Sequence, residues 1–410
     1  MKKHILFLIT LLLLSTAGIA QQLATWQDYI YAGQEKDSAG NYKGAIAQYT
    51  KAIEADPHNA VNFFYRGLAK DKLEDGKGAI DDFTSAIALD PTNAEYYNCR
   101  AITRKTIFHD FTGAIADFSQ AIALAPKDAN FYYNRGNAKD NIDDNAGAMA
   151  DYNKAIKLYP KDADFFYNRG ILRSIMGEHI AALTDLNKAI KLNADQADFY
   201  DERAIIKEKL EIYDDALKDY SKAIELTPNV AAYYDNRGSL RYDLDDYKGA
   251  IADYTLAILL DTANIEYIID RAYAHDMNED VKAAIADCNT AIRIAPDSAD
   301  NYYARGFVKF YSDDYQAALT DFTIATELAP QDVECLYMRG KVKFFMQQYE
   351  AALEDMEATI LLDPKHANAH YFRGAAKVEL GQKAAGCLDL VQSKQLGCTT
   401  AEDAIKEHCK

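Results

Sequence analysis

Small residues recur along this chain at the same place in every stretch of 34 residues, with aromatic residues at fixed distances from them. Within one stretch, two helical segments are expected, over residues 129–143 and 146–158, with Asp143–Asn145 as the turn between them. Small side chains let two helix backbones approach closely, and aromatic rings fill the space beside them. The pattern therefore predicts an all-α chain of helix-turn-helix units.

Three sets of positions define the period. The first small position is occupied by Gly33, Gly67, Ala101, Gly136, Gly170, Ala204, Gly238, Ala272, Gly306, Gly340 and Gly374. The second small position is occupied by Ala45, Ala79, Ala114, Ala148, Ala182, Ala216, Ala250, Ala284, Ala318 and Ala352. The aromatic position on the second helix is occupied by Tyr49, Phe83, Phe118, Tyr152, Tyr220, Tyr254 and Phe322. The eleven occurrences of the first small position predict eleven repeats.

The prolines mark the end of each repeat. They are Pro57, Pro91, Pro126, Pro160, Pro228, Pro296, Pro330 and Pro364, and successive gaps are 34, 35, 34, 68, 68, 34 and 34 residues. Ala194 and Thr262 occupy the missing positions inside the two double gaps. Proline cannot continue a helix and biases the preceding residue toward extended geometry, so one position of the period ends every unit.

Two segments of this pattern, Ala231–Gly238 (AAYYDNRG) and Gly249–Tyr254 (GAIADY), resemble the tetratricopeptide repeat family. The resemblance extends from residue 26 to about residue 396. It implies a right-handed α-solenoid of eleven 34-residue helix-turn-helix repeats, whose concave face is lined by the first helix of each pair and usually binds a peptide or protein segment. We expect the repeat array over residues 21–396 and a capping helix over residues 397–410.

Charged residues follow the same period. An arginine precedes the first small position at Arg66, Arg100, Arg135, Arg169, Arg203, Arg237, Arg271, Arg305, Arg339 and Arg373. A second base follows four residues later at Lys70, Arg104, Lys139, Arg173, Lys207, Arg241, His275, Lys309, Lys343 and Lys377. The second helix carries Asp82, Asp117, Asp151, Asp185, Asp219, Asp253, Asp287, Asp321, Asp355 and Asp389.

Two bases spaced i, i+4 repel each other unless an acid lies between them, so we expect each aspartate to pair with the bases of its own unit. The first unit has Ala32 and Gln48 at these positions, so its arginine and its aspartate are absent together. We name this set the Arg–Asp ladder. The alternative interpretation is a basic track that binds an anionic ligand.

The geometry of the family would turn certain first-helix positions toward the groove. In the last three units these candidate partner-binding residues are Tyr303, Phe307, Phe310, Tyr311, Tyr337, Lys341, Phe344, Phe345 and Tyr371. Earlier units carry Phe64, Tyr133 and Tyr167 there, mixed with Asp71, Asp140, Asp201 and Asp235. Aromatic side chains are effective anchors in recognition because they offer large area with little rotamer entropy. Two interpretations remain: a surface for a peptide or a stacked sugar, or packing against the neighbouring first helix.

The amino terminus has the pattern of a secretory signal peptide. Lys2 and Lys3 precede an apolar run from Ile5 to Leu14, and small residues follow up to Ala20. The run is too short to span a bilayer, which needs roughly 20 residues. We therefore expect residues 1–20 to be cleaved and the remaining chain to be soluble in the periplasm or outside the cell, without a membrane span. A net charge of −18 makes nucleic acid an unfavourable partner.

Three of the six cysteines fall in the last 24 residues, where the repeat pattern decays. A short amphipathic helix is expected from Thr399 onward, and a solenoid needs such a helix to cover the apolar face of its last unit. Folding it back about Thr399 brings Cys409 opposite Cys387. In an oxidising compartment this favours a Cys387–Cys409 disulfide, with Cys398 as the competing partner.

The chain carries no phosphate-binding glycine loop, paired-cysteine zinc motif or HExxH segment. His366 and His370 share one helix face, but two ligands do not make a metal site. We therefore expect no enzyme activity, no cofactor and no metal. The favoured function is an exported scaffold or adaptor of the bacterial cell envelope that binds peptide or protein segments in its concave groove. The alternative is a ligand-sensing or catalytic envelope protein that uses polar groups in the groove. The partner's identity and the oligomeric state do not follow from the sequence.

Overall fold

The computed structural model describes residues 25–409, and every regular element in this range is a helix. The predicted signal peptide, residues 1–20, lies outside the described residues. The chain divides into two compact units, with the boundary in the sequence between Asp195 and Gln196, and each is described by itself. No helix of residues 25–409 is long and apolar enough to cross a membrane.

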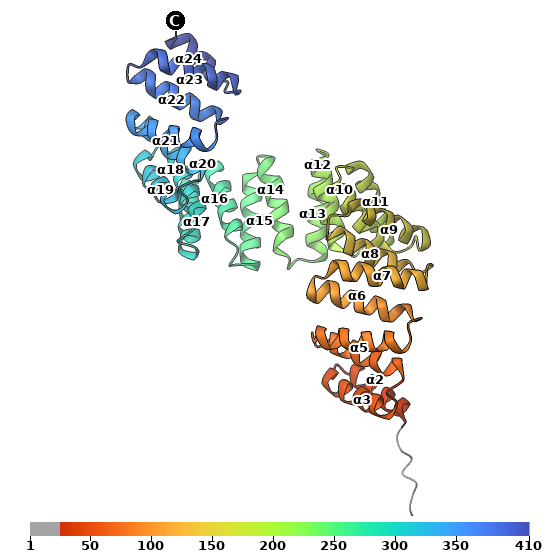
Figure 1. The fold of residues 1–410 in the computed structure, drawn as a ribbon. Helices are drawn as coiled ribbons and strands as arrows, with labels where there is room; N and C mark the ends of the chain where they lie inside the picture. The colour runs from red at the N-terminus through yellow and green to blue at the C-terminus, as the bar shows by residue number, and fades with distance from the viewer. Residues whose placement is uncertain (1–24, 410) are drawn as a thin grey trace, which may run out of the picture. The chain divides into compact units, whose positions relative to one another are not determined.

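Unit 1 is a stack of helix pairs (Figure 1). Its helices are α2 (Trp26–Ser38), α3 (Tyr42–Ala55), α4 (Ala60–Asp71), α5 (Gly76–Leu89), α6 (Ala94–Phe108), α7 (Phe111–Leu124), α8 (Ala129–Asp140), α9 (Asn145–Leu158), α10 (Ala163–Ile175) and α11 (His179–Leu192). Each even-numbered helix packs against the helix that follows it, and α3, α5, α7 and α9 each pack against the first helix of the next pair.

Unit 2 repeats this arrangement and adds one helix at its end. Its helices are α12 (Ala197–Lys209), α13 (Tyr213–Leu226), α14 (Ala231–Asp243), α15 (Tyr247–Leu260), α16 (Ile265–Met277), α17 (Val281–Ile294), α18 (Ala299–Tyr311), α19 (Tyr315–Leu328), α20 (Val333–Phe345), α21 (Tyr349–Leu362), α22 (Ala367–Glu379), α23 (Lys383–Gln395) and α24 (Ala401–His408). Even-numbered members up to α22 are the first helices of their pairs. The predicted all-α solenoid of helix pairs is confirmed within each unit.

The turn inside a pair is set by short polar residues. Asp143 adopts a left-handed backbone with φ +59°, which ends the first helix and redirects the chain. Asp144 then caps α9, because its carboxylate accepts a hydrogen bond of 3.0 Å from the backbone N–H of Gly147. The first helix of this pair therefore ends at Asp140, three residues before the expected end, and the second begins at Asn145.

The small positions are required by close helix contact. A Cβ atom added to Gly67 would lie 2.7 Å from a ring carbon of Phe83, and one added to Gly136 would lie 2.8 Å from Tyr152. Both rings are almost completely buried against these glycines. A methyl group at either glycine would force the ring or a helix to move, as the sequence pattern predicts.

Helix α24 lies against α23 and α22 at the end of unit 2. Cys387 of α23 and Cys409 form a disulfide in the structure, with their Cα atoms 5.6 Å apart. Cys398 is a free, buried thiol whose Sγ lies 3.1 Å from the hydroxyl of Thr400. The closing helix is thus held by packing at its start, where Ala401 is buried, and by a covalent link at its end.

Candidate functional site

The Arg–Asp ladder lies at the contact between the two helices of each pair. In one pair, Arg135 donates from Nε to Oδ2 of Asp151 at 2.9 Å and from Nη2 to Oδ1 at 2.7 Å, while Lys139 lies 2.8 Å from Oδ2. The fork-shaped guanidinium matches both carboxylate oxygens, which fixes the angle between the helices as well as neutralising the acid. The carboxylate of Asp151 is buried, and its two cations compensate for the loss of its contact with water.

The same two-bond geometry recurs with donor–acceptor distances of 2.6–3.0 Å in Arg66–Asp82, Arg100–Asp117, Arg135–Asp151, Arg169–Asp185, Arg203–Asp219, Arg237–Asp253, Arg271–Asp287, Arg305–Asp321, Arg339–Asp355 and Arg373–Asp389. The second base joins the same aspartate at 2.7–2.8 Å in every pair except that of His275. The predicted pairing within a unit is confirmed. The cations are already neutralised, which disfavours the alternative of a basic track for an anionic ligand.

The ladder arginines also reach backward to the preceding pair, a contact that sequence reasoning missed. Arg135 donates from Nη1 to the hydroxyl of Ser119 on α7 at 3.0 Å. Equivalent bonds join other ladder arginines to Thr50, Thr84, Asn153, Ser221, Thr255 and Asn289. The available signal was a short polar residue 16 positions before each of these arginines. The ladder therefore links successive repeats as well as the two helices of one repeat.

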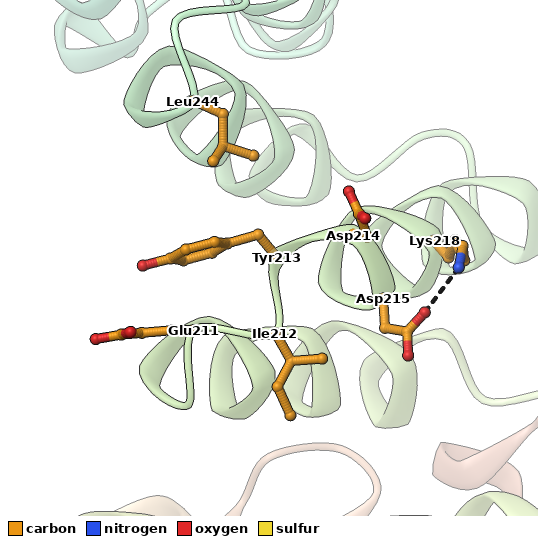
Figure 2. Close-up of a pocket in the computed structure, with 7 residues that line it drawn as sticks. All are labelled: Glu211, Ile212, Tyr213, Asp214, Asp215, Lys218 and Leu244. Atoms are coloured by element: carbon orange, nitrogen blue, oxygen red, sulfur yellow. Dashed lines mark hydrogen bonds and ion pairs between the residues drawn. The ribbon is translucent and has the colours of Figure 1, made fainter.

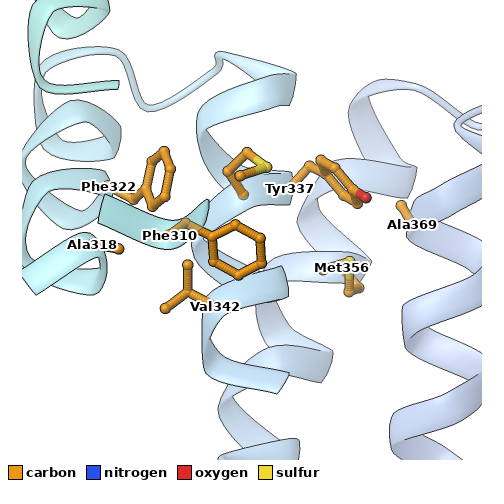
Figure 3. Close-up of a cluster of buried hydrophobic side chains, with 8 residues drawn as sticks. Phe310, Ala318, Phe322, Tyr337, Val342, Met356 and Ala369 are labelled. Carbon is orange, nitrogen blue, oxygen red and sulfur yellow. The ribbon is translucent and has the colours of Figure 1, made fainter. Parts of the chain in front are cut away.

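Two of the candidate partner-binding residues lie in the core rather than at the surface. Phe310 of α18 and Tyr337 of α20 are buried in a cluster with Val342, Met356 and Ala369 (Figure 3). The backbone of the first helix turns these two positions toward the next pair, as the packing interpretation expects. Their rings therefore offer little area to a partner.

The other candidates form a connected patch on the first helices. Tyr311 is 57% exposed and Phe345 is 45% exposed. The Nζ of Lys341 lies 4.8 Å from the ring centroid of Phe310 and 5.4 Å from that of Tyr311, within reach of cation–π attraction. The half-buried ring of Phe307 lies 4.6 Å from that of Tyr311. No carboxylate pairs with Lys341 in the described part of the chain.

We call this patch the aromatic surface and define it by Phe307, Tyr311, Lys341, Phe344 and Phe345. Tyr303 and Tyr371 are half-buried at its edges. Phe372 was missed because it stands one position beyond the expected groove phase, yet its ring lies 5.3 Å from Phe344 and 6.2 Å from Phe345. Phe372 therefore supports the aromatic surface from α22.

Acidic residues occupy the first helices on the amino-terminal side of the aromatic surface. We call Asp201 of α12, Asp235 of α14 and Asp270 of α16 the acidic surface. Asn236 donates to both oxygens of Asp201, at 3.1 and 3.2 Å, which joins α12 to α14. One carboxylate oxygen of Asp235, Oδ1, is inaccessible to solvent and has no hydrogen-bond partner. Sequence reasoning missed Asp270, which stands one position beyond the phase of the other two.

Burial without a matching cation shifts the pKa of all three carboxyls upward. Desolvation is the largest cause in each case. It raises the pKa of Asp201 and of Asp235 to about 6. Desolvation, with added repulsion from Asp235 and Glu266, raises the pKa of Asp270 to about 7. Among the described residues, none of the three acids forms an ion pair with a lysine or arginine, in contrast to the ladder aspartates.

A cavity of about 350 Å³ opens beside Asp270. It is lined by Ile265, Glu266, Ile269, Asp270, Ala295, Ser298, Asp300 and Asn301. The amide of Asn301 is already used, because it donates to the backbone carbonyls of Ala291 and Ala295 at 3.2 and 3.0 Å. Apolar walls and unpaired carboxylates thus meet in one space between α16 and α18.

A second cavity, of about 480 Å³, lies at the turn between α12 and α13 (Figure 2). It is lined by Glu211, Ile212, Tyr213, Asp214, Asp215, Lys218 and Leu244, all of them exposed. The only cation in this set, Lys218, is paired with Asp215 at 2.7 Å. None of the candidate partner-binding residues lines this cavity.

His366, which precedes α22, and His370 within it do not converge. His366 accepts at Nδ1 from the backbone N–H of Ala369 and lies 3.4 Å from Glu334 through Nε2. His370 is buried, and its Nε2 lies 3.1 Å from the carbonyl of Pro364. Within residues 25–409 no three histidine, cysteine or acidic side chains are grouped so that they could hold a metal ion.

Models of the tetratricopeptide repeat match several stretches of the chain. Those described as "Tetratricopeptide repeat" match residues 32–94, 129–162, 151–184, 231–264 and 337–386. One described as "TPR repeat" matches residues 110–139. Together these stretches make up more than half of the sequence.

Solved structures with a similar fold include yeast Tom70, at 17% identity and a TM-score of 0.46, with 92% of this chain and 93% of that chain covered. A tetratricopeptide repeat protein from Parabacteroides merdae matches at 18% identity and a TM-score of 0.46, over 61% of this chain and 98% of that one. No curated protein sequence matches the chain significantly. The repeat models, together with the helix pairs of both units, show that the chain belongs to the tetratricopeptide repeat family.

Proposed function

We propose that the protein is an exported scaffold that binds a segment of a partner protein on the aromatic surface of unit 2. Tetratricopeptide repeat proteins are typically non-catalytic scaffolds for protein partners, and this supports the general class. The observation that carries the specific proposal is the exposure of Tyr311 and Phe345, two large rings on consecutive first helices. Lys341 stands beside Tyr311 with no acid paired to it in the described chain.

These features suit recognition of an apolar segment. Rings held by neighbouring rings lose little conformational freedom on binding, so their burial converts efficiently into affinity. The ammonium of Lys341 would donate hydrogen bonds to a carboxylate or a backbone carbonyl of the bound segment at the same time. The remaining first-helix residues would act as the polar rim of the contact.

The binding site can be tested by photo-crosslinking. A photoreactive amino acid placed at Tyr311 or Phe345 should capture a defined partner in an envelope extract, whereas the same group at Tyr159 should not. Tyr159 is a matched control because it is 52% exposed but lies in unit 1. Capture from position 311 should be lost when Lys341 and Phe345 are replaced by serine. Capture from position 345 should likewise be lost when Lys341 and Tyr311 are replaced by serine. Equal capture from all three positions would contradict the proposal.

Export is proposed from the basic start, apolar run and small residues of the first twenty positions. The expected product begins at Gln21. Expression of the full chain in a bacterial host, followed by fractionation and amino-terminal sequencing, tests this directly. An intact Met1 on the cytoplasmic protein would refute export and leave the binding proposal to be judged by the crosslinking result.

A further inference from the structure

The cavity beside Asp270 has both apolar walls and acidic groups, which together complement a long basic side chain. Its half-buried walls include Ile265, Ile269 and Ala295, which are apolar. Its acidic members are Asp270, Glu266 and Asp300. Long basic side chains have the same division, since they lay an apolar stem along hydrocarbon while a cationic head seeks an anion.

The protein does not supply that cation itself. The ladder already occupies Arg237, which pairs with Asp253, and Arg271, which pairs with Asp287. Lys207 and Arg241 are likewise bound to ladder aspartates at 2.7 Å. The carboxylates of the acidic surface are therefore left without a neutralising partner from α12, α14 or α16 in the described structure, although burial makes their charge costly.

Ring contacts connect the helices that line the cavity, α16 and α18, with the aromatic surface. Tyr273 stands one turn after Asp270 on α16, and its ring meets that of Phe307 edge to face at 5.9 Å. Phe307 in turn contacts Tyr311. On α18, Asp300 precedes Tyr303 by one turn, and the ring of Tyr303 lies 6.3 Å from that of Phe307. A short bound segment would therefore contact acids at one end and rings at the other.

We propose that the cavity beside Asp270 binds a lysine or arginine side chain of the partner segment whose apolar residues lie on the aromatic surface. The inference rests on the proposed function and specifies the chemistry of the partner. Ile265 and Ile269 cover the stem of the basic side chain, and Asp270 with Glu266 and Asp300 pairs its head. The partner segment thus carries a basic residue a few positions from an apolar or aromatic stretch.

A peptide-display selection tests the partner's chemistry without assuming its sequence. A random peptide library is selected on the chain from Gln21 to Lys410, and in parallel on Asp270→Asn, on Asp214→Asn and on a Tyr311→Ser/Phe345→Ser variant. Asp214 is the matched control, because it is an exposed acid at the α12–α13 cavity and its replacement likewise removes one carboxyl group. Peptides that combine a basic residue with an apolar stretch should be enriched on the wild type and on Asp214→Asn.

The affinity of one enriched peptide is then measured by fluorescence anisotropy. Asp270→Asn should weaken binding about tenfold or more, since a half-buried ion pair loses one partner. Asp214→Asn should change it by less than about twofold, which is the general effect of one distant surface charge. Replacing the peptide's basic residue by its neutral counterpart should remove the difference between the wild type and Asp270→Asn. Free arginine should not compete at concentrations comparable to the peptide.

The outcomes separate this inference from the proposed function. Apolar peptides without a basic residue, lost on Tyr311→Ser/Phe345→Ser but retained on Asp270→Asn, would overturn the inference and support the aromatic surface. Basic peptides weakened equally by Asp214→Asn and Asp270→Asn would reduce the effect to net charge and overturn the inference. Equal enrichment on Tyr311→Ser/Phe345→Ser and on the wild type would overturn the proposed function. If free arginine binds as tightly as the peptide, the cavity is a site for a small cation and the inference is overturned. If the chain forms a dimer that Tyr311→Ser dissociates, the aromatic surface binds a second copy of the chain and the proposed function is overturned.

Discussion

The ladder aspartates and the aspartates of the acidic surface are the same residue type, both withdrawn from solvent, but their surroundings are opposite. Asp321 of the ladder receives two bonds from Arg305 and a third from Lys309. Asp270 of the acidic surface faces Asp235 and Glu266, which repel it. The ladder aspartates are paired with cations of the same chain, whereas the acids of the acidic surface have no cationic partner among the described residues.

This difference assigns different roles to the two regions. A buried charge pair with excellent geometry fixes orientation, and ten such pairs hold helix against helix along both units. A half-buried acid without a cation destabilises the free protein and is relieved by a cationic ligand, so the energy lost in folding is available for binding. The comparison predicts that the same change, aspartate to asparagine, has opposite effects in the two regions.

The largest effect is expected in the ladder. Asp321→Asn should lower the free energy of unfolding by about 3 kcal/mol, because Arg305 and Lys309 are left half-buried without their anion. The loss should be local, since each repeat contacts only its neighbours. Hydrogen exchange followed by mass spectrometry should show faster exchange in α18 and α19 and unchanged exchange in unit 1.

The ladder contains its own matched control. Asp287 pairs with Arg271 but has His275 at the position of the second base, and its side chain is 12% exposed where that of Asp321 is 1% exposed. Asp287→Asn should therefore cost less than Asp321→Asn in the same urea denaturation assay. Equal losses would mean that the second base contributes nothing to the ladder.

The repeating parts of the structure follow from the sequence because each was sampled many times. One glycine such as Gly136 is ambiguous, but eleven small residues at one phase identify close helix contact. The ladder was predictable for the same reason. The five residues that define the aromatic surface were likewise among the sequence candidates, but Asp270 and Phe372 were not, because they depart from the period by one position. A one-residue shift on a helix turns a side chain by about 100°, so the averaged pattern misplaces these two residues. Burial of Phe310 depends on its contacts with the following pair, which no single-repeat pattern contains.

The acidic surface should respond in the opposite direction. Asp270→Asn should raise the free energy of unfolding by about 1 kcal/mol near pH 8, a value that allows for solvent screening of a half-buried group. Urea denaturation of the wild type, Asp270→Asn and Asp214→Asn under identical buffer measures the change. Asp214→Asn should fall within about 0.5 kcal/mol of the wild type, as for most surface substitutions. A loss of stability in Asp270→Asn comparable to that in Asp321→Asn would remove the distinction between the two regions.

The smallest effect is the pH dependence that the same carboxyls impose. The folded-state pKa of Asp270 is about 7 and that of Asp235 about 6, both above the ordinary value of 3.8. The folded protein therefore binds more protons than the unfolded chain between these limits, and its stability increases as pH falls from about 8 to about 5. Asp389 of the ladder has the opposite effect on stability. Burial raises its pKa, but the hydrogen bonds and charges of Arg373 and Lys377 outweigh burial and lower it. The stabilisation from Asp389 is therefore lost only as pH falls further. Subtracting the pH profile of an Asp235→Asn/Asp270→Asn variant from that of the wild type isolates the contribution of these two carboxyls. The difference in free energy of unfolding between the variant and the wild type should shrink by roughly 1 kcal/mol as pH falls from about 8 to about 5. A difference that stays constant with pH would mean that these carboxyls are solvated like ordinary surface acids, and the contrast with the ladder would then rest on geometry alone.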